Sequence, residues 1–422
     1  MKVVLLNKTA EGGGAAVAAN RLYHALNKSD VEVSFLVQDQ TDNTRVQSIC
    51  NTKKDSIKAF IRFVKERLYF LPHEKNKSFR YSFSPANTGI DITNHPLILE
   101  ADVIHIHWIN QGFLSLKTLD KLFKLGKPIV WTLHDMWSFT GGCHYAGTCF
   151  EFIESCGHCQ FLKNPHKNDL SAKHFLAKKI IWKNIPFHIV SCSKWLKSLA
   201  NESSLLRNKQ LYNIPNPIDL EIYRPKNRIE SRKSLGLPSD KKLILFGAAN
   251  TEDPRKGMRY LIEALNILGE NFPLLQERLN LVVFGKSKKG TFDMPFTTHQ
   301  LNFVSDQDQL VSLYNAADAF ILPSLQDNLP NTVMESLACG TPVIGFRVGG
   351  VPEMIDHLKT GYLAEVRNSL SLATGIYEVI FGDQTEKMRL KARKVAEKRY
   401  DEKIVAEQYI QVYKDAIENT GK

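Results

Sequence analysis

The feature that most constrains the fold of this 422-residue chain is an alternation of strand-like and helix-like segments. In the first half, short β-branched or leucine-rich runs occupy 2–7, 32–37, 102–107, 129–133 and 188–191. Between them, stretches with apolar residues at helical spacing begin near Ala15 and Leu116. Strands that alternate with helices predict a parallel sheet covered by helices on both faces.

A proline-rich segment, 213–219, ends this half, and the same pattern then starts again. Strands are expected at 242–247, 281–284, 318–322 and 342–345, and helices at 258–268, 310–316 and 332–339. We therefore predict an α/β protein with two Rossmann-like domains, residues 1–213 and 214–398, that face each other across a cleft. The segment 399–422 is expected to be a helix that crosses back to the first domain. Ligands of such sheets bind beyond the carboxyl ends of the strands, which places the chemistry in the cleft.

The overall charge and hydropathy limit the classes of partner that the protein is expected to bind. No apolar run reaches the roughly 20 residues of a membrane span, and the first apolar run ends in a glycine turn, which argues against a signal peptide. The net charge of +11 favours an anionic partner, such as a phosphorylated substrate or an anionic membrane. No nucleic-acid-binding motif is present, so no nucleic acid is expected. We expect a soluble, cytoplasmic protein.

The segment 53–70 interrupts the alternation with a basic amphipathic pattern. Apolar residues fall on one helical face, among lysines and arginines: Ile57, Phe60, Ile61, Val64 and Leu68. Such a helix can lie on an anionic bilayer, here the inner face of the cytoplasmic membrane, as a peripheral contact. Alternatively, it packs its apolar face on its own domain and exposes a basic one.

The most informative motif runs from Pro323 to Ile344 and reads as a strand end, a polar loop, a helix start and a second strand. Backbone N–H groups at Asn328, Leu329 and Asn331 fall near the helix N-terminus, which is a ready site for an anion. The motif therefore predicts a phosphate-binding loop.

Two acids, Asp327 and Glu335, flank this predicted anion site with seven residues between them. Carboxylates beside a phosphate are unfavourable unless they bind hydroxyls, as on a sugar and a ribose. The alternative is a helix cap and a surface acid. This pattern resembles the Glu-x7-Glu motif of the retaining GT-B glycosyltransferases of family 4, and the resemblance covers nearly the whole chain. It implies that Glu335 holds the ribose hydroxyls and that Asp327, shorter by one methylene than the family's Glu, holds those of the donor sugar.

The resemblance also implies a basic element that grips the donor diphosphate. Lys256, in the segment 253–257, matches the family's Lys-Gly element and is expected to act as a point charge on the leaving phosphate. The family usually has an arginine six residues earlier, where this chain has Asn250, and Arg255 is the candidate substitute. A solvated charge at a helix start is the alternative.

Further candidates lie in the first half. Gly13 and Gly14 belong to a three-glycine run where the family places its first glycine loop, near the donor phosphates; a plain tight turn is the alternative. His134 follows a predicted buried strand, and the resemblance implies contact with the donor sugar, against a core or capping role. His105 and His107 are expected to point to opposite faces of their strand and to be structural.

Four of the seven cysteines fall in one short stretch: Cys143, Cys149, Cys156 and Cys159. Only the last pair has the spacing of a zinc knuckle. A structural zinc, redox-labile thiols or disulfides, and plain packing all remain open, and His144 and His158 are further candidate ligands. The same HDMW-F-T-G-G-C run occurs in a similar subset of exopolysaccharide transferases.

The resemblance implies front-face transfer with retention at the anomeric carbon, without a catalytic cofactor or divalent cation. We therefore expect a retaining glycosyltransferase of the bacterial exopolysaccharide or capsule type. It would move a sugar from a nucleotide-diphosphate sugar to a glycan acceptor, a lipid-linked oligosaccharide in surface polysaccharide biosynthesis. The alternatives are a GT-B sugar-nucleotide epimerase and a non-catalytic nucleotide-sugar binding protein.

Overall fold

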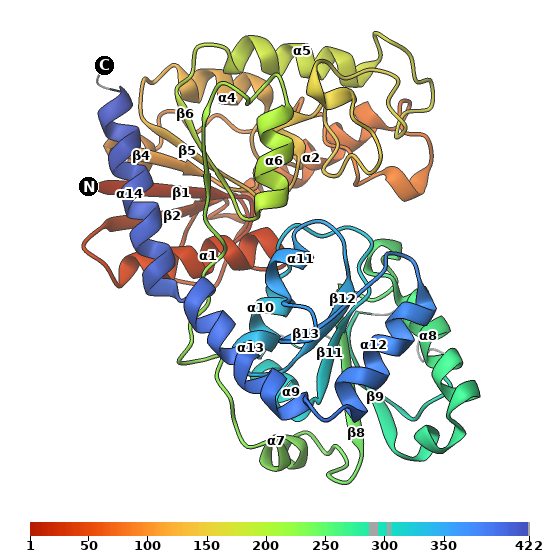
Figure 1. The fold of residues 1–422 in the computed structure, drawn as a ribbon. Helices are drawn as coiled ribbons and strands as arrows, with labels where there is room; N and C mark the ends of the chain where they lie inside the picture. Colours follow the sequence, from red (N-terminus) through yellow and green to blue (C-terminus); the bar gives the residue numbers. More distant parts are fainter. Residues whose placement is uncertain (287–293, 302–303, 305, 421–422) are drawn as a thin grey trace. The chain divides into compact units, whose positions relative to one another are not determined.

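The computed structural model describes residues 1–286, 294–301, 304 and 306–420 of the protein. The chain divides into two compact units, Met1–Asn216 with Val405–Lys422, and Pro217–Ile404. Each unit is built on one parallel sheet with helices on both faces (Figure 1). The prediction of two Rossmann-like α/β domains is therefore confirmed.

The N-terminal unit contains a seven-stranded sheet in the order β3-β2-β1-β4-β5-β6-β7. Its strands are β1 (Lys2–Asn7), β2 (Glu32–Val37), β3 (Gln47–Ser48), β4 (Val103–Ile106), β5 (Ile129–Leu133), β6 (Phe187–Ser191) and β7 (Gln210–Asn213). Its helices are α1 (Gly14–Asn27), α2 (Lys53–Phe70), α3 (Pro96–Glu100), α4 (Leu116–Phe123), α5 (Leu170–Trp182), α6 (Lys194–Glu202) and α14 (Glu402–Thr420). Neighbouring strands pair in parallel throughout, as the alternation predicts.

Side chains of this sheet alternate between two apolar layers, because successive residues of a strand point to opposite faces. Val4 and Leu6 of β1 lie in the layer covered by α4, α5 and α6. Val3 and Leu5 lie in the layer covered by α1 and α14. The C-terminal helix α14, blue in Figure 1, runs alongside this sheet and buries an apolar stripe that includes Val405 against it. Burial on both faces explains why the strands read as continuous apolar runs.

The C-terminal unit contains a six-stranded parallel sheet in the order β10-β9-β8-β11-β12-β13. Its strands are β8 (Lys242–Asn250), β9 (Leu279–Lys286), β10 (Thr298–Leu301), β11 (Ala319–Leu322), β12 (Val343–Phe346) and β13 (Gly361–Ala364). Its helices are α7 (Arg228–Ser234), α8 (Met258–Asn271), α9 (Gln307–Ala316), α10 (Asn331–Ala338), α11 (Val351–Met354), α12 (Ser369–Phe381) and α13 (Thr385–Tyr400). Helices α8 and α12 cover one face, and α9, α10 and α13 lie over the other (Figure 1). The strand order reverses between β8 and β11, where ligands of doubly wound sheets bind.

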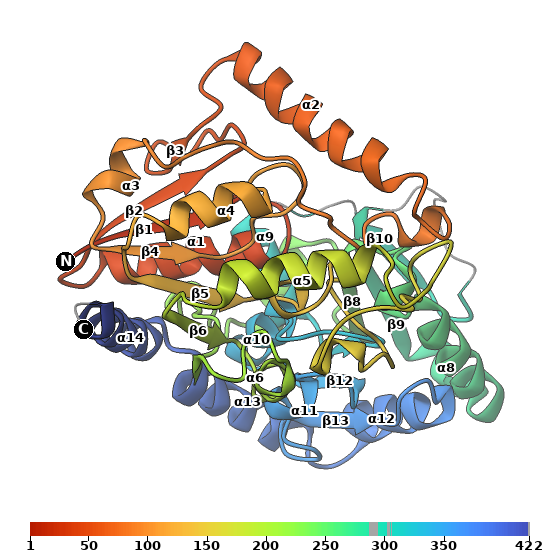
Figure 2. The ribbon, with the colours of Figure 1, turned by 90° about the horizontal axis from the view of Figure 1, so that it is seen from above.

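Helix α2 lies at the periphery of the N-terminal unit (Figure 2), and of its residues only Phe70, at its end, belongs to one of the two apolar layers. Four of the five stripe residues are exposed, by 57% for Ile57, 65% for Phe60, 45% for Ile61 and 60% for Leu68, and Val64 is partly buried. The interpretation that this stripe packs on its own domain is therefore wrong. Among the helices of the described residues, none is long and apolar enough to cross a membrane.

Candidate functional site

An ion pair in the C-terminal unit joins two residues that are 71 positions apart in the sequence. The Nζ atom of Lys256 lies 2.7 Å from Oδ2 of Asp327, and both side chains are partly buried. Lys256 follows β8 and Asp327 follows β11, the two neighbouring strands at which the order of the sheet reverses. The structure therefore brings these two predicted residues together at the expected ligand position of the sheet.

The turn that carries Lys256 is held against the loop after β11. Asp253 caps it by accepting the backbone N–H of Arg255 at 2.9 Å, and the carbonyl of Arg255 accepts the N–H of Leu325 at 2.7 Å. Gly257 ends the turn at φ 72°, and a Cβ atom there would lie 1.8 Å from the carbonyl oxygen of Pro323. Only glycine fits this left-handed position and this close backbone approach.

A second glycine fixes the backbone of Asp327. Gly349 has φ 54°, and a Cβ atom there would lie 1.9 Å from the carbonyl oxygen of Asp327. The same oxygen accepts the N–H of Gly350 at 3.3 Å. The sequence analysis missed this pair, although two adjacent glycines after a strand are a detectable signal of close backbone approach.

Glu335 lies inside α10 with only 4% of its surface exposed. Its Oε2 atom accepts the hydroxyl of Tyr314, on α9, at 2.7 Å. Burial, with the neighbouring Glu335 carboxylate, raises the pKa of Tyr314 well above its usual value, so the phenol stays a donor. Tyr314 thus orients the Glu335 carboxylate, and no sequence motif marks it.

The residues of the predicted phosphate-binding loop lead directly into α10. Asn328 and Leu329 are buried, and Asn331 is the first residue of the helix, after Pro330. The N-terminal N–H groups of a helix lack intrahelical acceptors and carry partial positive charge. This end of α10 is therefore a candidate anion site, and it begins only a few residues after Asp327 in the chain.

The two remaining candidates of this unit are engaged locally. The guanidinium of Arg255 bonds to Asp253 at 2.6 Å and is half exposed. Asn250 ends β8, and its side-chain oxygen accepts the N–H of Glu252 at 3.0 Å. The structure therefore shows Arg255 paired within its own turn and Asn250 stabilising the start of that turn.

The glycine run of the N-terminal unit forms an exposed turn between β1 and α1. Gly12 and Gly13 have φ values of 77° and 107°, and Gly14 is the first residue of α1. A Cβ atom at Gly12 or Gly13 would meet nothing within 4 Å. The backbone conformation, and not crowding, therefore requires glycine at these two positions.

His134 follows β5 and contacts His107, which in turn lies beside His105. Its Nε2 atom lies 3.0 Å from Nδ1 of His107, and burial lowers the pKa of His134 to about 4, so the ring is neutral at pH 7. The rings of His105 and His107 lie 4.2 Å apart. The prediction that they point to opposite faces is therefore wrong, because residues two apart in a strand share a face. His105 bonds to Tyr413 and Thr132 inside the core.

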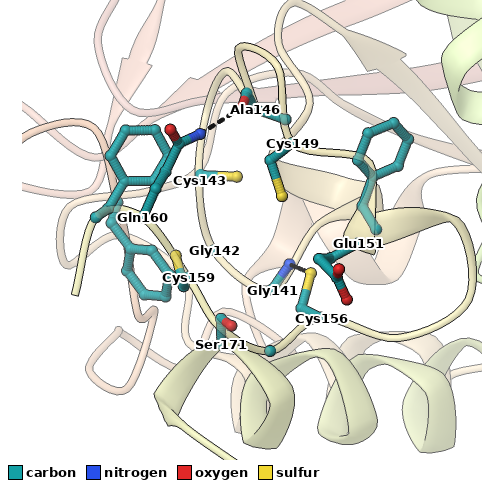
Figure 3. Close-up of a pocket in the computed structure, with 14 residues that line it drawn as sticks. Gly141, Gly142, Cys143, Ala146, Cys149, Glu151, Cys156, Cys159, Gln160 and Ser171 are labelled. Carbon is teal, nitrogen blue, oxygen red and sulfur yellow. Dashed lines mark hydrogen bonds between the residues drawn. The ribbon is translucent and has the colours of Figure 1, made fainter. Parts of the chain in front are cut away.

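The four clustered cysteines line one small cavity of about 20 Å³ in the N-terminal unit (Figure 3). All are free thiols, as are the other three cysteines. Neither candidate histidine joins them: the ring nitrogens of His144 bond to Asp135 and Ser84, and His158 is exposed. Among the residues that the structure describes, no group of three or more His, Cys, Asp or Glu side chains is spaced to hold a metal ion.

Comparison with known proteins assigns the chain. Residues 12–222, half of the sequence, match the profile of Glycosyltransferase Family 4, and residues 227–399 match that of Glycosyl transferases group 1. The chain belongs to glycosyltransferase family 4. It is therefore a sugar-transferring enzyme of the GT-B fold, as the resemblance of its motifs implied.

Relatives of this glycosyltransferase span most of its length. It is 28% identical over 349 residues to an uncharacterized glycosyltransferase of Methanocaldococcus jannaschii, which covers 76% of this chain and 84% of the relative. It is 26% identical over 355 residues to the glycosyl transferase WcaC of Escherichia coli K12, provisionally assigned to colanic acid biosynthesis, covering 81% and 82%.

Solved structures share the fold of this glycosyltransferase. The sucrose-phosphate synthase of Thermosynechococcus elongatus superposes with a TM-score of 0.66 at 16% identity, covering 98% of both chains. HepE of Anabaena, in complex with UDP-glucose, gives a TM-score of 0.63 at 15% identity, covering 98% of this chain and all of HepE.

Proposed function

We propose that this glycosyltransferase uses a nucleotide-diphosphate sugar as donor and that the diphosphate binds beside Lys256 and the start of α10. The observation that carries the proposal is the 2.7 Å contact of Lys256 with Asp327 where the strand order reverses. The complex of HepE with UDP-glucose, a protein of the same fold, supports this class of donor.

Three parts of the C-terminal unit have complementary roles in this proposal. Lys256 supplies a point charge, and the N-terminus of α10 supplies oriented dipoles, for the charge that develops on the departing diphosphate. Asp327 holds the ammonium group of Lys256 when no donor is bound and accepts hydroxyls of the donor sugar. Glu335, oriented by Tyr314, accepts the ribose hydroxyls.

The proposed reaction retains the configuration of the anomeric carbon. The bond between this carbon and the diphosphate oxygen breaks, and the acceptor oxygen bonds to the same face. The acceptor proton passes to an oxygen of the leaving diphosphate, so no side-chain nucleophile is needed. In the N-terminal unit, the neutral ring of His134 and the turn at Gly13 and Gly14 are the groups that we propose for substrate contact.

The donor proposal is tested by thermal shift with a panel of nucleotide sugars. A ligand that binds only the folded state stabilises it by about 2.7 kcal/mol at 100 times its Kd, so one donor should raise Tm by several degrees. That donor is then incubated with lipid-linked oligosaccharides, and we expect a product heavier by one sugar in mass spectra. If no nucleotide sugar shifts Tm or is consumed, the proposal fails. Isomerised sugar without an acceptor would indicate an epimerase, and binding without turnover a non-catalytic protein.

The acceptor, we propose, is a glycan linked to a membrane lipid, with the enzyme docked peripherally on the inner face of the cytoplasmic membrane. The surface that supports this is α2. Its exposed apolar stripe is bordered by exposed lysines: Lys53, Lys54, Lys58 and Lys65. Apolar side chains among lysines match the acyl chains and anionic headgroups of a bilayer, and each lysine near such a surface contributes about 1 kcal/mol.

The opposite side of α2 holds the helix on its unit, both through the buried ring of Phe70 and through polar contacts. Glu66 is fully buried, with Oε1 bonded to Arg67 at 2.7 Å and Oε2 accepting the N–H of Gly112 at 3.0 Å. Arg62 donates to the carbonyl of Gly112 at 3.2 Å. Because this side already anchors the helix, the exposed apolar residues on its other side are left to face a partner.

Replacing three stripe residues of α2 tests the membrane surface. The triple variant Ile57→Ser, Phe60→Ser, Leu68→Ser should lose at least about tenfold in affinity for vesicles containing phosphatidylglycerol, because buried apolar area contributes roughly 25 cal/mol per Å². Co-sedimentation measures this, and high salt should weaken binding of the unaltered protein.

The matched control replaces three exposed apolar residues of the C-terminal unit: Ile229, Leu274 and Leu390. Their triple serine variant should bind vesicles as well as the unaltered protein does. Absence of vesicle binding by the unaltered protein, or an equal loss in the control, would refute the membrane surface. A dimer that only the α2 variant loses would instead identify a second copy of this chain as the partner.

A further inference from the structure

The cysteine cluster lies in a long irregular segment between β5 and α5. From 134 to 169 the chain forms only two 3-10 turns, Trp137–Phe139 and Glu151–Ile153. Loops longer than about 12–15 residues without secondary structure are uncommon in compact domains and need another source of order. Yet much of this segment is buried, including Phe139 and Phe152. A covalent or metal cross-link would explain its order.

The four cysteines of this segment surround a single space. Figure 3 shows the sulfur atoms of Cys143, Cys149, Cys156 and Cys159 bordering the same cavity. Its volume of about 20 Å³ is close to that needed by one water molecule, so it has room for one small ion but not for a multinuclear cluster. The remaining walls are mostly apolar, which favours coordination by the thiolates over solvation by water.

The backbone of the segment supports sulfur ligands. The N–H of Gly141 donates to Sγ of Cys156 at 3.0 Å, a hydrogen bond of the kind that stabilises a coordinated thiolate. His158, between Cys156 and Cys159, has φ 46°, a left-handed conformation that is uncommon for a residue other than glycine. This turn brings both sulfurs to the same cavity, with the two-residue spacing of zinc knuckles.

A buried lysine lies beside the cluster. Lys178 of α5 is fully buried, and its ammonium group donates to the backbone carbonyls of Trp137 and Thr140. It lies within electrostatic range of Cys143 and Cys156. Burying a lysine is costly unless a counter-charge is near. Four thiolates around a divalent ion carry a net charge of −2, which would place negative charge near this ammonium group.

We propose that these four cysteines bind one structural zinc ion that fixes the segment between β5 and α5. Each thiol loses its proton to solvent when it coordinates, and the ring of sulfurs closes onto the ion with Zn–S distances of about 2.3 Å. Zinc fits because four thiolates in a closed tetrahedral site are typical of structural zinc, and the proposal does not depend on the donor site of the C-terminal unit.

Metal analysis of the purified full-length enzyme tests this directly. Mass spectrometry of elements should find one zinc per chain, and replacement by cobalt should give the strong visible absorption of a tetrahedral thiolate complex. A strong chelator should lower Tm and expose the four thiols to a thiol reagent. The variants Cys143→Ser and Cys156→Ser should lose most of the zinc, whereas Cys156→His should keep it, because imidazole is also a zinc ligand.

The control is Cys50→Ser, since Cys50 is buried in the same unit but outside the cluster. It should retain a full complement of zinc. Folding of every variant is checked by circular dichroism and gel filtration, and the His variant keeps the test decisive if the serine variants do not fold. Metal-free purified protein with four reactive thiols, bound iron in place of zinc, disulfides among the four, or equal zinc loss in Cys50→Ser would each overturn the proposal.

Discussion

The variant Lys256→Ala is expected to lower kcat/KM for sugar transfer by about 10²- to 10³-fold, the usual cost of removing one group that stabilises transition-state charge. The lysine is held 2.7 Å from Asp327 by a turn that Gly257 and Leu325 fix in place. Most of the loss should appear in kcat, because the charge on the diphosphate grows as its bond to the sugar breaks. Initial rates over a range of donor concentrations measure both parameters.

Two controls separate this role from a general loss of charge or of structure. Lys359→Ala removes an exposed lysine of the same unit and should leave kcat/KM unchanged. Lys256→Arg keeps the charge on a differently shaped group and should fall between the two. Unaltered kcat/KM in Lys256→Ala would remove the lysine from the site. An equal loss in Asp327→Asn, with kcat restored in Lys256→Met/Asp327→Asn, would show that the ion pair is only structural.

The variant Glu335→Ala is expected to raise the KM of the donor by roughly 100-fold or more. A hydrogen bond to a charged group contributes about 1.5–3 kcal/mol, and the proposal gives this carboxylate two ribose hydroxyls. Binding of the corresponding nucleoside diphosphate, measured by calorimetry, should weaken to a similar degree. Because the ribose is remote from the breaking bond, kcat should change less than KM.

Tyr314→Phe is the matched control, because Glu335 also accepts the buried hydroxyl of Tyr314. The phenylalanine variant keeps the carboxylate that would contact the ribose, so it should raise KM much less than Glu335→Ala does. If Tyr314→Phe and Glu335→Ala raised KM equally, the role of Glu335 would be to anchor α9 and not to bind the donor. Unchanged binding of the diphosphate in Glu335→Ala would also refute the assignment.

The parts of the candidate site that could be predicted are those written in contiguous sequence. The segment from Asp327 to Glu335 joins a strand end to a helix start, and its polar residues and Pro330 mark this locally. Tyr314 and Gly349 were not predicted, because their roles depend on contacts with residues that are distant in the sequence. From the sequence alone, a tyrosine on a helix is interpreted as an ordinary core residue. Its hydrogen bond to a carboxylate is evident only in the structure.

Helix α2 shows what hydrophobic periodicity can and cannot predict. Its bounds, Lys53–Phe70, coincide with the predicted segment, because apolar spacing and the Thr52 cap are local properties. Periodicity identifies the apolar face but not what that face contacts. The burial of Glu66 and the exposure of Phe60 became visible only with the backbone of Gly112 in place.

The sequence by itself determined the two Rossmann-like domains and most strand positions. These follow from short-range chemistry: hydrophobic period, turn residues and helix starts. The grouping of Asp327, Glu335 and Lys256 in one site came from the resemblance of their motifs to those of the family. Only the tertiary structure decided that Lys256 meets Asp327, that α2 turns its apolar side outward, and that four cysteines share one cavity. Each of these depends on which strands become neighbours, and that order results from long-range packing of both sheet faces, which no local pattern encodes.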